Sequence, residues 1–140
     1  MKVGAESLVY FQFLPFLGLN LLQQRKYTDA ETILRDCLAV LDKKQPDVWT
    51  TFSTRSMLGE ALVGQKKYAE AEPLLLQGYE GMKQREKTIP PQGKVRLTES
   101  VERLVQLYDA WGKKDKSDEW SKKRDELRKA LTPMPKEKQP

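Results

Sequence analysis

The sequence predicts an all-α fold, a solenoid of about three helical hairpins in a single domain. Three observations predict it. Apolar residues recur at steps of three and four along most of the chain, one hairpin-sized segment repeats at a fixed offset, and helix-breaking residues fall between the periodic segments. With 140 residues, 39% of them hydrophobic and 32% charged, the chain suits one domain with a modest core.

The clearest hairpin lies between residues 48 and 79. Its first helix carries Leu58 and Leu62 on one side, and its second helix begins near Tyr68 with the same spacing of apolar residues. A hairpin of this size cannot bury both of its apolar faces alone, so it needs neighbours of the same kind. We therefore expect one domain over residues 1–131, with hairpins at about 8–44, 47–87 and 94–131.

Pro15 interrupts the most apolar run of the chain, residues 8–22. The run is too short and too interrupted for a membrane span. A lone Lys2, a nearby Glu6 and the lack of a small-x-small cleavage site argue against a secretory signal. Because a proline inside a helix loses a hydrogen bond and clashes with the preceding turn, we expect a kink at Pro15 or a helix that begins near it, with residues 16–24 as the clear helical part.

Proline, glycine and aspartate mark the later boundaries. Pro73 lies close to a helix start and should bend that helix rather than end it. The segment 88–93, TIPPQG, has the strongest break chemistry and connects the second hairpin to the third. Asp115 is expected to cap the last helix. The tail 132–140 has three prolines and no core residue, so we expect it to be disordered.

Composition argues against most kinds of site. The chain has no His and one cysteine, Cys37, which excludes an intrachain disulfide and a His/Cys metal cluster and favours a core role for that thiol. No Asp or Glu pair stands out for acid–base work, so we expect a protein that is not an enzyme and binds no cofactor and no metal. The 25 basic and 20 acidic residues are interspersed, which disfavours nucleic acid and membranes as partners. We expect a cytoplasmic protein.

An internal repeat relates the first two hairpins at an offset of 41 residues, the separation of Gly18 and Gly59. The small side chain at these two positions should let the helices of each hairpin approach closely. The matching positions are Leu17-Gly18, Leu21, Gln24, Lys26-Tyr27, Ala30-Glu31 and Leu34 with Leu58-Gly59, Leu62, Gln65, Lys67-Tyr68, Ala71-Glu72 and Leu75. The third hairpin matches less well, as expected of a capping unit with a polar outer face.

At these residues the chain resembles the tetratricopeptide repeat, whose pattern has the Leu-Gly pair, an aromatic residue before the second helix and a small residue three positions later. The spacing of 41 and the Lys-Tyr-x-x-Ala-Glu run are similar to the kinesin-light-chain-like subclass. The segments 64–75 and 78–86 are similar to repeats at the C-terminal end of certain bacterial serine/threonine protein kinases. The resemblance implies a right-handed solenoid that serves as a protein-interaction scaffold. No kinase motif occurs, so it implies no kinase chemistry.

The resemblance also implies a concave groove lined by the leading helix of each hairpin. The register places the following residues towards it: Gln12, Leu19, Gln23, Ser53, Ser56, Glu60, Val63, Glu99, Glu102, Gln106 and Asp109. A floor that is polar to acidic at its C-terminal end predicts a peptide with basic or hydroxyl groups there. The two-carboxylate clamp of chaperone-binding members is disfavoured, because Pro15, Leu19 and Met57 stand at its positions. The alternative that these residues are simply exposed, with no partner, stays open.

A second hypothesis places the interaction at the apolar N-terminal run. The run exceeds what one hairpin needs to bury, and an exposed apolar patch favours self-association, as in a homodimer, or docking as a regulatory tail to the rest of a larger kinase-like protein. The candidate residues are Leu8, Tyr10, Phe11, Phe13 and Phe16. Both hypotheses predict a protein or peptide partner.

Overall fold

The computed structural model describes residues 5–131, apart from the side chains of residues 5–9, 11 and 12. It confirms the all-α fold, because the described residues form helices and no strand. The helices are α1 (Ala5–Gln23), α2 (Tyr27–Lys44), α3 (Trp49–Gly64), α4 (Tyr68–Gln84), the 3-10 helices η1 (Glu86–Thr88) and η2 (Pro91–Gly93), α5 (Lys94–Trp111) and α6 (Lys114–Leu131). The tail 132–140, expected to be disordered, lies outside the described residues.

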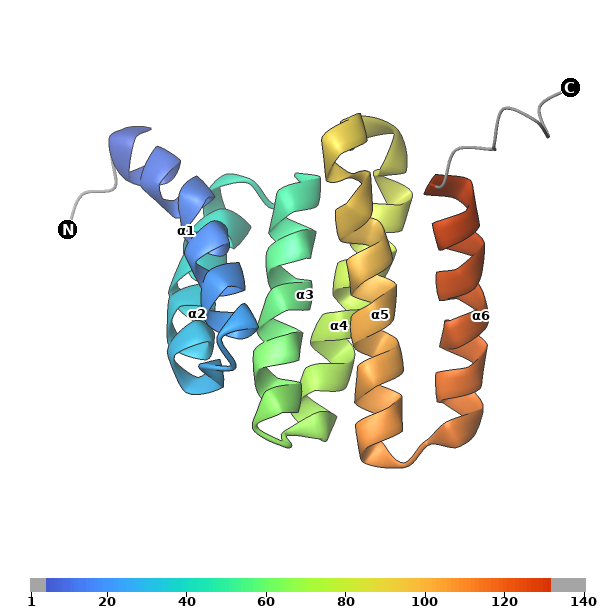
Figure 1. Ribbon diagram of the computed structural model, residues 1–140. Helices are drawn as coiled ribbons and strands as arrows, with labels where there is room; N and C mark the ends of the chain where they lie inside the picture. The colour runs from blue at the N-terminus through green and yellow to red at the C-terminus, as the bar shows by residue number, and fades with distance from the viewer. Residues whose placement is uncertain (1–4, 132–140) are drawn as a thin grey trace, which may run out of the picture.

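The helices stand side by side in chain order and pair into antiparallel hairpins, α1/α2, α3/α4 and α5/α6 (Figure 1). The three hairpin turns lie along one edge, and the connections between hairpins lie along the opposite edge. Each hairpin packs on the next, since α2 contacts α3 and α4 contacts α5. The leading helices are also neighbours: α3 contacts both α1 and α5, so these three helices together form one side of the solenoid.

Glycine brings the two helices of the first and second hairpins together. A Cβ atom at Gly18 would lie 2.5 Å from Leu34, and one at Gly59 would lie 2.5 Å from Leu75. Real Cβ atoms do not approach that closely, so each leucine occupies space that any larger residue on the facing helix would take. Leu34 and Leu75 are themselves fully buried. The internal repeat therefore reports a packing requirement that both hairpins meet in the same way.

Two prolines lie inside helices. The expectation that a helix begins near Pro15 is wrong, because α1 runs without a break from Ala5 to Gln23, whereas the helix expected over residues 16–24 is present as far as Gln23. Leu14, next to the proline, is buried with Cys37 and Leu41 of α2, and this packing holds the turn where the proline removes a hydrogen bond. Pro73 also leaves α4 continuous. The last helix begins at Lys114, one residue before the expected cap.

Each hairpin turn contains one residue in the left-handed region. These residues are Arg25 (φ 60°), Lys66 (φ 64°) and Gly112 (φ 77°), which occupy corresponding places before the second helix. Only glycine adopts this backbone without a steric cost from its side chain. The first two turns therefore carry a strain that the third avoids.

Candidate peptide-binding groove

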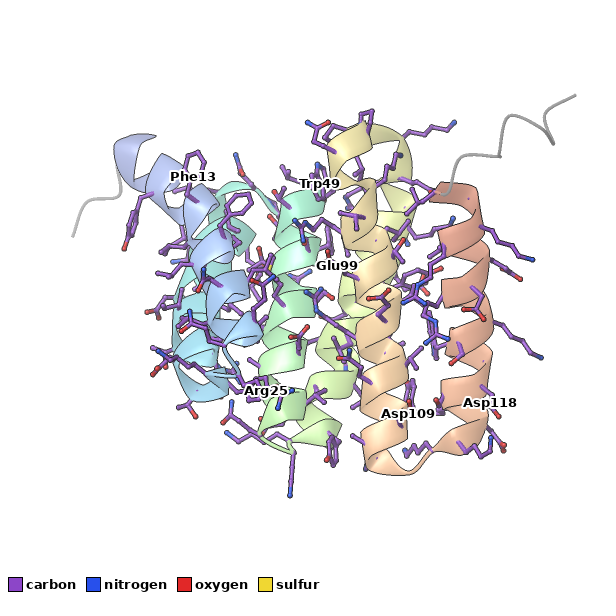
Figure 2. All side chains as sticks on the ribbon, viewed as in Figure 1. Phe13, Arg25, Trp49, Glu99, Asp109 and Asp118 are labelled. Carbon is purple, nitrogen blue, oxygen red and sulfur yellow. The ribbon has the colours of Figure 1, made fainter. Side chains whose placement is uncertain are left out.

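Two adjoining hollows lie between the leading helices. The first, here called the apolar hollow, is lined mostly by apolar side chains, namely Pro15, Phe16 and Leu19 of α1, Trp49, Thr50, Ser53 and Met57 of α3, and Arg96 of α5. The second, here called the charged hollow, is lined by Leu19 and Gln23 of α1, Glu60 of α3, and Arg96, Glu99, Glu102, Arg103 and Gln106 of α5. Leu19 and Arg96 line both, so the hollows form one groove that crosses all three hairpins. Figure 2 shows Trp49 near one end of α3 and Glu99 further along, between α3 and α5.

Trp49 forms a fixed wall of the apolar hollow. It is the first residue of α3 and packs on the core shared by the second and third hairpins. A Cβ atom at Gly93 would lie 2.8 Å from its ring, so the indole is held against the connector between α4 and α5. Phe16 on the opposite wall is 62% exposed. The hollow thus combines one rigid aromatic wall with one aromatic side chain that has little of its surface covered.

Arg103 lies in the floor of the charged hollow and holds the neighbouring polar side chains in place. Its side chain is only 5% exposed, although arginine is seldom buried without partners. Its Nε donates a hydrogen bond to Glu60 Oε1 at 2.6 Å, and its Nη1 donates to Ser56 Oγ at 3.0 Å. A guanidinium buried in this way needs these acceptors, because an unpaired charge in the interior is costly. Arg103 therefore fixes the spacing of α3 and α5 at the groove floor.

The other two carboxylates of the charged hollow also face arginines. Arg96 Nη1 donates to both oxygens of Glu99 at 2.8 Å, and Glu99 lies 3.7 Å from Arg103 Nη2. Arg128 of α6 donates to Glu102 at 2.6 Å. The floor that the sequence predicts as polar to acidic is thus a network of paired charges. Arg96 and Arg103 escaped the sequence prediction, although their spacing of three and four residues from Glu99 was a usable signal.

The structure brings most of the sequence-predicted groove residues together. Those that line one hollow or the other are Leu19, Gln23, Ser53, Glu60, Glu99, Glu102 and Gln106. Ser56 is fully buried as the acceptor for Arg103, and Val63 packs against the core. Asp109 lies at the α5–α6 end, where its carboxylate accepts a hydrogen bond from Ser117. The side chain of Gln12 lies outside the described residues.

The aromatic residues of the N-terminal run lie on two different sides of α1. Tyr10, Phe13 and Phe16 are 61%, 63% and 62% exposed. Phe16 lines the apolar hollow, and the Phe13 ring lies 6.3 Å from the Phe16 ring. Tyr10 instead lines a hollow at the outer side of the first hairpin, with residues of α2. The side chains of Leu8 and Phe11 lie outside the described residues.

The remaining reactive groups of the described part serve packing. Cys37 is fully buried between α1 and α2, and burial raises the pKa of its thiol to about 12. Tyr108 donates a hydrogen bond to Glu72 at 2.8 Å. The pKa of the phenol is raised, mainly by burial and to a smaller extent by this bond. Among the residues that the structure describes, no group of three or more acidic, His or Cys side chains could hold a metal ion. None of the helices between residues 5 and 131 has the length and apolar character that crossing a membrane requires.

Residues 51–84, which include nearly all of α3 and α4, match the family described as Tetratricopeptide repeat. The match supports a protein of the tetratricopeptide type. Such repeats generally mediate protein–protein interaction and are typically non-catalytic. No curated protein matches the chain.

Proposed function

We propose that this chain is a non-catalytic scaffold that binds a peptide segment of a partner protein in the groove of α1, α3 and α5. The observation that carries the proposal is the junction of the apolar hollow with the charged hollow, which share Leu19 and Arg96. A groove of this form suits a peptide with one apolar anchor beside polar or charged groups, because apolar burial supplies affinity and placed polar groups supply orientation.

The polar half of the peptide is expected to carry basic or hydroxyl groups. Glu60, Glu99 and Glu102 line the charged hollow, and each is paired with one arginine, namely Arg103, Arg96 and Arg128. Because a carboxylate can accept more than one hydrogen bond, a basic or hydroxyl group on the ligand can share these oxygens with the arginines. Gln23 and Gln106 are exposed at the same hollow and can exchange hydrogen bonds with a peptide backbone.

The test is selection of binders from a displayed library of random peptides against the full chain. The selected peptides are then measured by calorimetry on three variants. Phe16→Ser and Gln106→Arg change the two hollows, and Val95→Ser serves as the control because Val95 is an exposed aliphatic residue of α5 that lines neither hollow. We expect affinity to fall at least about tenfold in the two groove variants and to stay unchanged in the control. Equal binding by all three variants contradicts the proposal.

We also propose a subclass and an origin for the repeat. The repeat offset of 41 residues and the Lys-Tyr-x-x-Ala-Glu run support a kinesin-light-chain-like subclass, and the segments 64–75 and 78–86 support a relation to the repeat region of bacterial serine/threonine kinases. On this proposal the protein is cytoplasmic and bacterial.

A second candidate function is self-association, or docking to a larger protein, through the apolar N-terminal face. The observation that favours it is the exposure of Tyr10 and Leu17, at 61% and 47%, on the outer side of the first hairpin. Phe13 and Phe16, which the sequence groups with Tyr10, lie towards the groove and fit the first candidate function better.

A further inference from the structure

The first hairpin presents an outer surface, here called the end face, that no other element of the described chain covers. It is a hollow lined by Tyr10, Leu14 and Leu17 of α1 and by Ile33, Asp36, Ala39 and Val40 of α2. Apart from Asp36 these side chains are apolar or aromatic. Tyr10, Leu17 and Ala39 are exposed, while Leu14 is buried.

The later hairpins bury the face that corresponds to this one. At the repeat offset of 41, Leu17 corresponds to Leu58, which is 1% exposed in a cluster with Leu34 and Leu38 of α2. Leu14 corresponds to Arg55, which forms an ion pair with Asp42 of α2 at 2.6 Å.

The third hairpin repeats this arrangement. It buries Leu97, Val101 and Leu104 in one cluster with Leu75 and Tyr79 of α4. The same face is therefore an interface at both internal junctions, and only the first hairpin leaves it open.

The two ends of the solenoid differ in character. In α6, at the opposite end, only Ser117 and Trp120 are buried, and most of the rest of the helix is charged and exposed. A second copy stacked head to tail would bury those charges against the apolar end face, which is costly. A second copy related by a twofold axis would instead place one apolar end face against the other.

The outer stripe of α2 is complementary to itself in an antiparallel pair at every position except Asp36. Asp29, Ile33, Asp36, Val40 and Lys44 recur at steps of four and three, so they share one side of the helix. If two such helices run antiparallel about a point between residues 36 and 37, Ile33 faces Val40 of the other copy, and Asp29 faces Lys44 of the other copy. Asp36 then lies beside Asp36 of the other copy, and this like-charge contact at the axis opposes the pairing. Because of the twofold symmetry, the Ile33–Val40 and Asp29–Lys44 contacts each occur twice in the dimer.

Asp29 and Lys44 are available for such pairing. Both are exposed, and neither forms an ion pair within the described residues. Asp29 lies in the first turn of α2 and Lys44 in the last turn. Antiparallel helices also place opposite ends of their dipoles together, which favours this orientation over a parallel one.

We propose that the chain forms a twofold-symmetric homodimer through the end face, with α2 antiparallel to α2 of the second copy and Asp29 paired with Lys44 across the axis. The inference deepens the second candidate function above and does not depend on the groove. In this dimer the groove residues Phe16 and Gln106 stay outside the interface, and each copy keeps its own groove.

Sedimentation velocity and light scattering of the full chain over a concentration series test the proposal. We expect the mass to approach twice the 16.2 kDa of one chain as concentration rises. Leu17→Asp and Val40→Asp should leave a folded monomer. Val95→Asp is the matched control, since it adds the same charge at an exposed aliphatic residue of α5, and it should leave the dimer unchanged. A wild-type chain that stays monomeric at every concentration overturns the proposal.

Charge reversal tests the antiparallel register. Asp29→Lys and Lys44→Asp should each weaken the dimer about tenfold, because each places like charges together at two symmetric contacts. The double variant should restore most of the dimer. A dimer that either reversal leaves unchanged, or that the double variant fails to restore, overturns the register. Circular dichroism checks that every variant is folded. Phe16→Ser should keep the dimer while it weakens peptide binding, so the two proposals fail separately.

Discussion

At the scale of single residues, the first two hairpin turns are less stable than they could be, because each has a residue other than glycine in a left-handed backbone conformation. Arg25 and Lys66 adopt φ values of 60° and 64°, where a Cβ atom meets the following carbonyl, while Gly112 occupies the corresponding place at 77°. The left-handed backbone costs a non-glycine residue about 1–2 kcal/mol. A glycine substitution removes this cost, but roughly half of the gain in stability is offset because glycine makes the unfolded chain more flexible.

We therefore expect Lys66→Gly and Arg25→Gly each to raise the free energy of unfolding by about 0.5–1 kcal/mol. Gly112→Ala supplies the opposite case. A Cβ atom there would meet nothing within 4 Å, so its expected loss of about 1 kcal/mol comes from the backbone alone. Urea denaturation measures all three variants, and a loss of stability in Lys66→Gly would contradict the steric argument.

Cys37 gives the fold a dependence on alkaline pH. Burial raises its pKa from 9.0 to about 12, so the folded state keeps the thiol neutral while the unfolded chain ionises. This contribution is fully present below about pH 9 and is lost as the pH rises towards the folded value. At about pH 10.5 the wild type should have lost about 2 kcal/mol that Cys37→Ala does not lose.

Urea unfolding of both proteins near pH 7 and about pH 10.5 gives the comparison for Cys37. The loss of stability that Cys37→Ala shows between the two pH values is the control, because all other groups titrate equally in the two proteins. The thiol should also react with a maleimide in denaturant but not in the native state, since the side chain is fully buried. Equal losses in both chains would refute the assignment.

At the scale of the elements, the sequence predicts helices better than it predicts their partners. The period of 3.6 residues and the Gly18 and Gly59 pairings depend on neighbours within one hairpin, so they can be read from the chain directly. The beginning of α1 could not be predicted in this way, because α1 continues through Pro15 with Leu14 packed against α2, a contact that the local pattern does not show. Local rules for proline describe an isolated helix, and tertiary contacts here outweigh them.

The link between α3 and α5 depends on one arginine. Arg103 reaches Glu60, 43 residues away in sequence, with a side chain that is 5% exposed. Arg103→Ala leaves a half-buried carboxylate without its main partner and should cost about 2 kcal/mol of stability. Arg103→Met with Glu60→Gln should recover much of that loss, because both members of the pair are then neutral.

A double-mutant cycle in urea measures the coupling between Arg103 and Glu60. We expect a coupling energy of at least about 1 kcal/mol. Asp42 and Arg55 are the matched comparison, since their ion pair also joins two hairpins but is more exposed, at 39% and 21%. That pair should show weaker coupling. Equal coupling in the two pairs would mean that burial does not set the strength of the Arg103 contact.

At the scale of the whole molecule, the sequence predicts which residues line the groove better than it predicts which ion pairs they form. The residues that line the hollows follow from the positions of the leading helices, which is why Leu19, Gln23, Glu60 and Gln106 could be placed from sequence. The arginine partners of Glu60 and Glu102 could not be predicted from sequence. They are Arg103 and Arg128, which lie 43 and 26 residues away, and each arginine reads in sequence as part of a solvated helix.

The stacking of the hairpins also determines which parts of the protein should unfold locally first. Each hairpin packs mainly on its neighbours, so the central hairpin is covered on two sides and each end hairpin on one. In α6, Trp120 is the only large buried side chain, packed edge-on against Tyr79 at 5.0 Å between ring centroids. Native-state hydrogen exchange should therefore find the strongest amide protection in α3 and α4 and earlier opening in α6.

Trp120→Ala should remove about 3 kcal/mol and speed exchange in α6, and to a lesser degree in α5, while the amides of α2 keep their protection. The result depends on contacts that extend only to the next hairpin. If the substitution speeds exchange equally in α2 and α6, the molecule unfolds as one cooperative unit, and the stacking of hairpins does not limit how far a local loss of packing spreads.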